Sequence, residues 1–215
     1  MSGGFRIMEV LKKVTGLSSL FLFIITISIS FVILFTPLYY YTASSLGLPD
    51  TLNLSIEALM ENYYVLLKYL HFPWITELNF PDFISSESGL FHFFEVKILF
   101  YLNYIILILS AIGSFIYFRV IKRTKRIWTL QKPFFIASLV PPLLLLFLTV
   151  SFDKMFVLFH EIFFNNDDWL FNPATDPIIL ALPEEFFMYT FLLFFLLIET
   201  LFIFMYQYSK RNAFK

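Results

Sequence analysis

Residues 17–38 read LSSLFLFIITISISFVILFTPL and contain no charged side chain. An α-helix rises about 1.5 Å per residue, so about 20 apolar residues cross a hydrocarbon core ~30 Å thick. Three further apolar runs of similar length lie at 98–118, 134–152 and 186–208. The first run is too long for the core of a signal peptide, and no small-residue cleavage site follows it. We therefore predict an all-α integral membrane protein with four transmembrane helices.

The composition supports the same class. The chain of 215 residues is 59% hydrophobic and only 14% charged, with a mean hydropathy of +0.79. A soluble domain carries about 25% charged residues. We expect a single membrane domain over 1–215, without internal repeats. The chain has no cysteine, which excludes disulfides, thiolate metal sites and thioester intermediates.

Charged residues divide between the two sides of the predicted helices. Twelve of the 15 Lys and Arg residues lie before the first run, between the second and third, or after the fourth. Fourteen of the 16 acids lie in 39–97 and 153–185. Because basic segments stay on the cytoplasmic side, this bias predicts that both termini are cytoplasmic and that these two segments lie outside. We expect a multi-pass protein of the cell membrane with an extracytoplasmic cap of short helices and loops.

The second outer segment carries more chemistry than a connecting loop needs. Residues 159–176 read FHEIFFNNDDWLFNPATD, with one histidine, four acids and three asparagines. His160 follows the third run by eight residues and His92 precedes the second by six, so both are expected near the headgroup level. An imidazole titrates near neutral pH, which suits proton transfer in both directions. We predict a reactive site at the outer face, with His160 and His92 as its catalytic residues.

Other site chemistries find less support. His160-Glu161 begins a zinc-protease pattern, but Phe164 stands where that motif needs its second histidine. No serine stands in a Gly-x-Ser-x-Gly elbow, and the outer segments lack arginine, which favours a neutral, lipid-like substrate over one held by its phosphate. We predict no metal and no cofactor. The basic loop 119–132 is interpreted as a topology signal, and no nucleic-acid partner is expected.

Two segments resemble those of a known family. Residues 91–97, FHFFEVK, and residues 159–187, with FHEIFFNNDDW, NPATD and PEEFF, are similar to the lipoprotein intramolecular transacylases of low-GC Gram-positive bacteria. The likeness extends over the whole chain through the four spans and the LGLP at 46–49. Glu95 stands where the family pattern His-x-x-Asp-Val-Lys has aspartate, and Asn172 also replaces an expected aspartate.

The resemblance implies an acyltransferase that acts on diacylglyceryl-modified lipoproteins in contact with membrane lipid. Such an enzyme moves one acyl chain from the glyceryl group to the α-amine of the N-terminal cysteine. The product is an N-acyl, S-monoacylglyceryl (lyso-form) lipoprotein. Amine and ester belong to one substrate, so the reaction needs no covalent enzyme nucleophile, in agreement with the lack of cysteine. The site is expected to face the extracytoplasmic side.

This reaction lets us predict roles for the polar residues of the cap. We expect His160 to act as the base for the attacking amine and then as the acid for the departing glycerol oxygen. His92 would stabilise the oxyanion or share the proton shuttle. A carboxylate would orient the His160 ring, as in a Ser-His-Asp triad, with further polar side chains in support. The carboxylate candidates are Glu161, Asp168 and Asp176, and the weaker polar candidates are Tyr40 and Asn166.

Two alternatives remain open at this point. A non-catalytic four-helix membrane protein, such as a binding or immunity subunit, explains the helices but gives the two histidines no task. A metal-dependent membrane hydrolase predicts bound metal and a loss of activity with chelators. Loss of function at each histidine, with stability preserved, would count against the first alternative.

Overall fold

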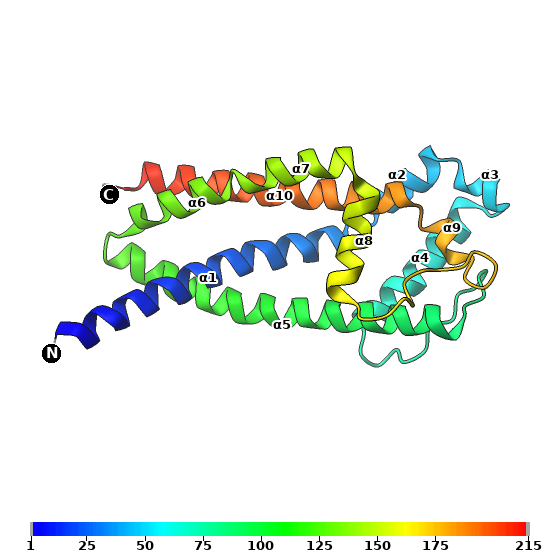
Figure 1. Cartoon of the computed structure of the whole chain (residues 1–215), viewed down its shortest axis with the longest axis horizontal. Helices are drawn as coiled ribbons and strands as arrows, with labels where there is room; N and C mark the ends of the chain where they lie inside the picture. Colours follow the sequence, from blue (N-terminus) through cyan, green and yellow to red (C-terminus); the bar gives the residue numbers. More distant parts are fainter. Residues whose placement is uncertain (1, 214–215) are drawn as a thin grey trace. The chain divides into compact units, whose positions relative to one another are not determined.

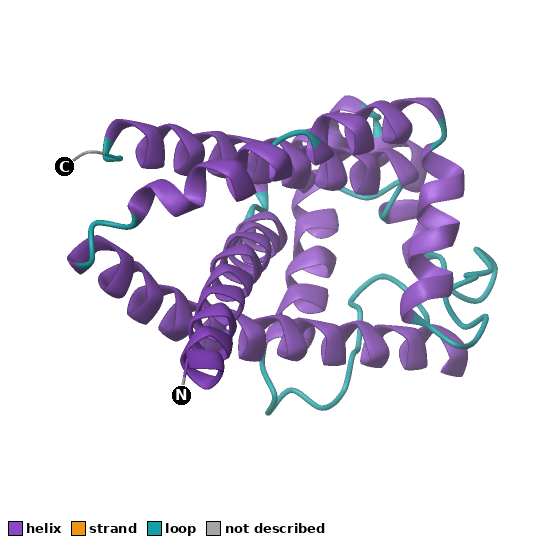
Figure 2. Ribbon diagram, turned by 60° about the vertical axis from the view of Figure 1, so that its left-hand side comes forward, coloured by secondary structure: helices purple, strands orange, loops and turns teal. Residues whose placement is uncertain are grey.

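The computed structural model describes residues 2–213, and side chains from Ile7 onward. In this part of the chain every regular element is a helix, as Figures 1 and 2 show. The longest connections lie between α4 and α5 and between α8 and α9 (Figure 2). The elements are α1 (Ser2–Leu34), α2 (Pro37–Ser45), α3 (Leu48–Leu52), α4 (Ile56–His71), α5 (Glu87–Arg123), the 3₁₀ helix η1 (Ile127–Leu130), α6 (Gln131–Ala137), α7 (Val140–Val150), α8 (Phe152–Phe163), α9 (Ile178–Ala181) and α10 (Glu184–Arg211).

Four helical stretches are long and apolar enough to cross a membrane. They are Ile7–Leu34, Glu87–Arg123, Ile127–Val150 and Glu184–Arg211, and each contains most of one predicted run. Large apolar side chains along them are exposed, including Leu109 and Leu143, which fits lipid rather than water as the surrounding solvent. The all-α, four-span prediction is confirmed.

The helix boundaries differ from the predicted ones at three places. α1 ends at Leu34, because Pro37 opens a new helix, α2, at its first position. α5 begins at Glu87, eleven residues before the second apolar run, so His92 lies in the same helix as that run. The third span is interrupted at 138–139, just before Pro141 and Pro142 in the first turn of α7.

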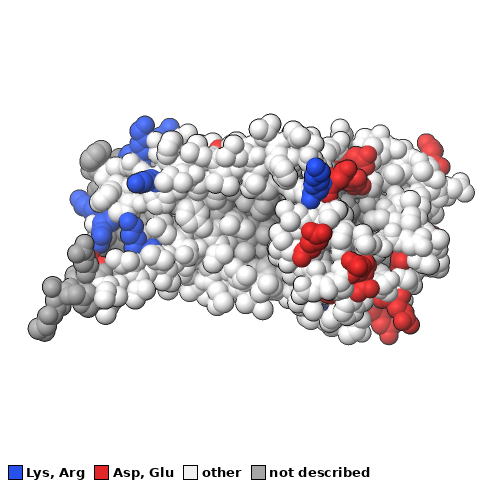
Figure 3. Space-filling view, in the orientation of Figure 1, with Lys and Arg blue, Asp and Glu red and all other residues white. Residues whose placement is uncertain are grey.

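The chain forms two compact units. Unit 1 consists of residues 1–32, 103–147 and 192–215, and unit 2 consists of residues 33–102 and 148–191. Both segments predicted to form the cap, 39–97 and 153–185, belong to unit 2. Acidic side chains gather over unit 2 and most basic ones over unit 1 (Figure 3). The charge division seen along the sequence is therefore also a division between the two units.

Unit 1 is held together by apolar packing. Its buried core comes from α1, α5, the η1–α6 segment and α10, with Leu130 and Phe134 fully buried. Gly16 of α1 lies so close to Tyr117 of α5 that a Cβ atom would be 2.1 Å from the ring. Small residues allow this close helix approach, which is a common feature of packing in membranes.

Unit 2 is organised around a stack of tyrosines. Tyr39 of α2 and Tyr63 of α4 stack with ring centroids 4.1 Å apart, and Phe186 packs edge-on against both. The Tyr39 hydroxyl donates to the Ala181 carbonyl of α9 over 3.0 Å. Burial raises the pKa of Tyr39, so this hydroxyl keeps its proton and remains a donor. The stack thereby ties α2, α4, α9 and the start of α10 into one support.

Candidate active site

The position of His92 depends on how α5 begins. Asp176, from the segment before α9, is buried, and its Oδ1 accepts from the Ser86 backbone N–H over 2.8 Å and from the Ser86 hydroxyl over 2.9 Å. A carboxylate at this end of a helix satisfies a free N–H group and interacts favourably with the helix dipole. Gly89 permits the approach, because a Cβ there would lie 2.2 Å from Asp176 Oδ1. Asp176 therefore caps α5 six residues before His92.

His92 itself lies in an aromatic environment. Its side chain is 7% exposed. The ring packs edge-on against Phe164, with centroids 4.8 Å apart, and against Phe171, with centroids 5.5 Å apart. Within the described residues its Nδ1 atom is buried and makes no hydrogen bond. One polar atom of His92 is thus held in an apolar setting with its hydrogen-bonding capacity unused.

His160 lies on the face of α8 that packs against α10. Phe152, Phe156 and His160 follow one another at four-residue spacing, which places them on one side of the helix. Phe152 contacts Phe191 with centroids 6.2 Å apart, and Phe156 contacts Phe187 at 5.5 Å. This packing fixes the rotation of α8 and so directs the His160 ring inward, where it is 8% exposed.

The protonation of His160 follows from its hydrogen bond. Nδ1 lies 2.7 Å from the Phe156 carbonyl oxygen, which can only accept, so Nδ1 carries the proton and donates. In the neutral ring Nε2 then holds the free lone pair. Burial lowers the pKa of His160, and the hydrogen bond to Phe156 opposes this effect in part. The neutral ring, with Nε2 as a base, is favoured near pH 7.

The loop after α8 folds over this histidine. The Trp169 indole stacks on the His160 ring with centroids 4.6 Å apart and an angle of 26° between the planes. The indole N–H donates to the Asn166 carbonyl over 3.0 Å, and Asn166 Oδ1 accepts from the Asp168 backbone N–H over 3.1 Å. The Asn166 side-chain amide donates to Glu95 Oε1 over 2.9 Å, which joins the loop to α5.

These elements bring the two predicted histidines together. The ring centroids of His92 and His160 lie 5.8 Å apart, with 37° between the ring planes, although the residues are 68 positions apart in the sequence. Two imidazoles at this separation can act on one small group or pass a proton through it. Over the described residues no three His, Cys, Asp or Glu side chains gather as metal ligands would.

The other predicted residues take varied places. Asn166 lies beside the pair through Trp169 and Glu95, and Asp168 is half-buried in the same loop, with its backbone N–H bonded to Asn166. Glu161 is exposed, and Asp176 supports the site as the α5 cap rather than through the His160 ring. Tyr40 is 52% exposed, whereas its neighbour Tyr39 lies in the core.

Three contributions were not predicted from the sequence. The Phe156 carbonyl, not a carboxylate, holds His160 Nδ1, and a backbone group leaves no mark in the residue pattern. Trp169 stacks on the ring, and Glu95 reaches the loop from the turn of α5 after His92. Glu95 follows His92 by three residues, which places both side chains on one face of a helix. This spacing could have identified Glu95 as a residue near the site.

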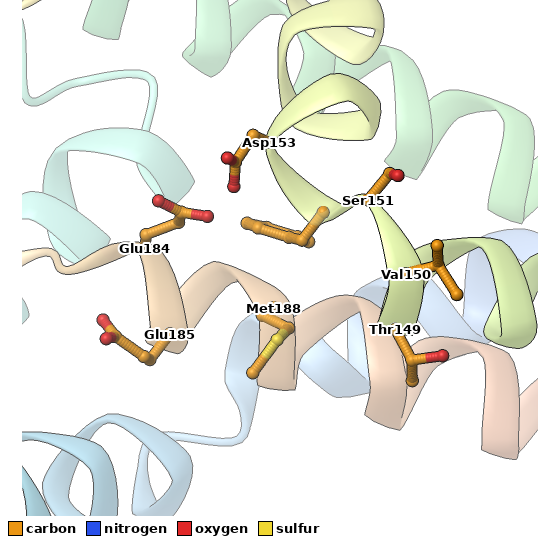
Figure 4. Close-up of a pocket in the computed structure, with 8 residues that line it drawn as sticks. Thr149, Val150, Ser151, Asp153, Glu184, Glu185 and Met188 are labelled. Carbon is orange, nitrogen blue, oxygen red and sulfur yellow. The ribbon is translucent and has the colours of Figure 1, made fainter.

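A polar hollow of about 380 Å³ also lies in unit 2, between the α7–α8 junction and the start of α10. In Figure 4 the carboxylates of Asp153 and Glu184 point toward each other across it, beside Ser151 and Met188. Neither histidine of the pair lines this hollow. It is therefore a feature separate from the pair.

Comparisons with known proteins identify the family and the fold of the chain. The family model of the lipoprotein intramolecular transacylase Lit matches residues 14–187. An in meso structure of the membrane integral lipoprotein intramolecular transacylase Lit from Bacillus cereus superposes with a TM-score of 0.91 at 29% identity, covering 97% of each chain. Two structures of that protein with one histidine replaced, by arginine or by alanine, each give a TM-score of 0.81 at 28% identity. They cover 98% of this chain and 95% and 97% of their own.

A comparison with curated proteins found no match. The family match extends over most of the chain, and the chain therefore belongs to the lipoprotein intramolecular transacylase family. It is an acyltransferase and a multi-pass membrane protein. This confirms the family and the enzyme class predicted from the two histidine segments, and it decides against the non-catalytic and hydrolase alternatives.

Proposed function

We propose that this enzyme moves one acyl chain from the diacylglyceryl group of a bacterial lipoprotein to the α-amine of its N-terminal cysteine, giving the lyso-form. The observation that carries the proposal is the buried pair of His92 and His160, with ring centroids 5.8 Å apart. Family membership supports lipoprotein transacylation in general. The pair supports the specific chemistry, because acyl transfer from an ester to an amine requires proton transfers that imidazoles perform.

His160 acts first as the base. The α-ammonium, with a pKa near ~8, loses one proton to the surroundings to give the attacking amine. As the amine nitrogen bonds to the ester carbonyl carbon, His160 Nε2 takes a second proton from that nitrogen. The tetrahedral intermediate then collapses, the carbon–oxygen bond to glycerol breaks, and His160 returns the proton to the glycerol oxygen. The products are an amide and a free hydroxyl group.

His92 supports the charge that develops on the way. Its Nδ1 is buried and unused within the described residues, so one ring nitrogen is available to the reacting group. A ring N–H directed at the ester oxygen stabilises the oxyanion, and such a donor typically contributes about 10²–10³ in rate. His92 can also share the proton with His160 across the short gap between the rings.

The aromatic surroundings confine the substrate. Phe164 and Phe171 pack on His92, and Trp169 covers His160, so the reacting groups are held out of water. Amine and ester are parts of one molecule. Holding them in contact and in the right orientation lowers the activation free energy by roughly 7–11 kcal/mol. No protein nucleophile is needed for this reaction.

The site faces the extracytoplasmic side in this proposal, with both termini in the cytoplasm. Support comes from the charges, since 12 of 15 basic residues belong to unit 1 and 14 of 16 acids to unit 2, which contains both histidines. Basic segments remain cytoplasmic during insertion. The histidines then lie at the level of the glycerol esters of the outer leaflet, where a lipid-modified N-terminus is anchored.

Mass spectrometry of lipoprotein N-terminal peptides tests the proposal. A host that makes diacylglyceryl lipoproteins would express the wild type, His160→Ala, or His71→Ala as a matched control. His71 is the remaining histidine and packs against Phe100. We expect lyso-form peptides with the wild type and His71→Ala and none with His160→Ala at equal membrane abundance. Lyso-form peptides at wild-type levels with His160→Ala would overturn the mechanism.

A further inference from the structure

Glu95 makes one hydrogen bond that the protein needs for its own structure. Its Oε1 accepts from the side-chain amide of Asn166 over 2.9 Å, which fastens the loop that carries Trp169 to α5. A structural role of this kind uses one oxygen of the carboxylate and does not require a negative charge. Glutamine would serve it equally well.

The second oxygen of Glu95 has no such explanation. Oε2 is buried and, within the described residues, accepts no hydrogen bond. A buried charged acceptor without a donor is strongly unfavourable. The nearest cation along the chain, Lys97, is engaged elsewhere: its ammonium donates to the Ile75 carbonyl over 2.5 Å and lies 4.2 Å from the centre of the Tyr69 ring. Within the described residues no Lys or Arg side chain forms an ion pair with the Glu95 carboxylate.

The location of Glu95 connects this oxygen to the histidine pair. Glu95 follows His92 by three residues on α5, so the two side chains share one face of the helix. Its partner Asn166 also accepts the indole N–H of Trp169, which stacks on His160. The Glu95 carboxylate therefore lies on the same face of α5 as His92, and its Oε1 is held by Asn166.

We propose that Glu95 Oε2 accepts a hydrogen bond from the protonated α-amine of the substrate's N-terminal cysteine. The inference rests on the function proposed above, and it names the group by which the site recognises its substrate. The substrate is the only participant in that reaction that brings a cation. Glu95 holds the ammonium beside the pair without taking its proton, and the amine attacks once it is deprotonated.

This assignment makes Glu95 a specificity-determining residue. A diacylglyceryl lipoprotein with a free amine carries the cation, whereas neutral diacylglycerol lacks it. The N-acylated product has an amide in its place, so the contact with Glu95 is lost when the reaction is complete. The positive charge of the α-amine then favours binding of the substrate, and its loss in the amide favours release of the product.

Binding of two unreactive lipopeptides tests this inference. Both carry a dialkyl-ether glyceryl group on an N-terminal cysteine, so no acyl chain can move, and one has a free α-amine while the other is N-acetylated. Their dissociation constants would be measured with the wild type, Glu95→Gln, Glu95→Asp and His160→Ala in nanodiscs. We expect the wild type to prefer the free amine by roughly 10- to 100-fold, as for a charge-assisted hydrogen bond.

Each variant isolates one part of the inference. Glu95→Gln keeps an acceptor for Asn166 and is expected to bind the two peptides equally, whereas Glu95→Asp keeps the charge and is expected to retain a preference for the amine. His160→Ala is expected to keep the full preference, because that residue acts in catalysis and not in holding the ammonium. A failure of the proposed function would appear separately, as turnover of the ester substrate by His160→Ala.

Two results would overturn the assignment. The first is equal binding of the two peptides by the wild type, which needs no variant and is decisive even if a substitution impairs folding. The second is a full wild-type preference in Glu95→Gln with an unchanged melting temperature.

Discussion

The two units use their polar side chains in different ways. In unit 1 the hydroxyls of α1 mostly bond back to their own helix, as Ser28 does to the Ile24 carbonyl over 2.8 Å. In unit 2 polar side chains join segments that are far apart in the sequence, as in the Tyr39–Ala181 and Ser86–Asp176 bonds. A hydroxyl that bonds to a carbonyl of its own helix does not fix how that helix packs against other segments. Unit 1 is therefore held together mainly by apolar packing, whereas unit 2 also depends on polar contacts between distant segments.

The largest effect is expected from removing the side chain that caps α5 in unit 2. Asp176→Ala removes the acceptor for the Ser86 N–H and hydroxyl groups and for the Thr175 hydroxyl. Leaving buried donors unsatisfied costs about 1–3 kcal/mol, so the melting temperature and the transacylase rate should fall together. Asp176→Asn keeps an acceptor at Oδ1 and is the control. Wild-type stability in Asp176→Ala would contradict a cap role.

Acid sensitivity should belong to unit 2, because all three histidines lie there. Burial lowers the pKa of His160 below its unfolded value of about 6.5. The unfolded state therefore binds the proton more readily, and the contribution of His160 to stability is complete above pH ~6.5 and declines as pH falls toward the folded pKa. The slope is at most about 1.4 kcal/mol per pH unit for one group.

Thermal melting between pH 8 and pH 5 measures this slope. We expect His160→Gln to melt with a weaker dependence on pH than the wild type, since glutamine does not titrate in this range. The same pH dependence in both proteins would show that other groups account for the acid sensitivity of unit 2.

Trp169→Phe should have a smaller effect. Phenylalanine keeps a ring to stack on His160 but loses the indole N–H that donates to the Asn166 carbonyl over 3.0 Å. A hydrogen bond of this kind contributes about 0.5–1.5 kcal/mol net. We expect a few-fold loss of rate, measured with a purified lipopeptide, and little change in melting temperature. A complete loss of activity would mean that Trp169 contacts the reacting groups itself.

The smallest effect is expected in unit 1. Asn103 of α5 donates to the Ser30 hydroxyl of α1 over 2.9 Å, a bond between two helices of unit 1. Such bonds in membrane proteins average about 0.6 kcal/mol. Asn103→Ala should lower the melting temperature slightly and leave the transacylase rate unchanged. A large loss of rate with intact folding would contradict the proposal that the catalytic residues belong to unit 2 alone.

The sequence predicted what depends on local composition. Four apolar runs are enough to identify four spans, and two histidines in polar outer segments identify the pair. The start of α5 at Glu87 was missed, because Asp176, 90 residues away from Ser86, determines it. An apolar run marks only where a helix meets lipid and not where the helix begins.

The orientation of single side chains was also beyond the sequence. Tyr39 and Tyr40 look alike in an aromatic belt, but one residue along a helix is a turn of about 100°, which separates the core from the surface. Tyr39 is 1% exposed and Tyr40 is 52% exposed. The bond from His160 Nδ1 to a backbone carbonyl likewise has no sequence pattern, so a carboxylate partner was expected instead.

A double-mutant cycle on the histidine pair tests the central claim most directly. Acyl transfer rates would be measured for the wild type, His92→Ala, His160→Ala and the double variant, all at equal stability. If the two imidazoles act on one reacting group, replacing the second histidine lowers the rate far less in the single variant than in the wild type. The reason is that rate losses are not additive for residues that act as a unit. We predict single losses of roughly 10²–10⁴-fold and a double loss close to the larger of them. Fully additive losses would contradict a joint role for His92 and His160.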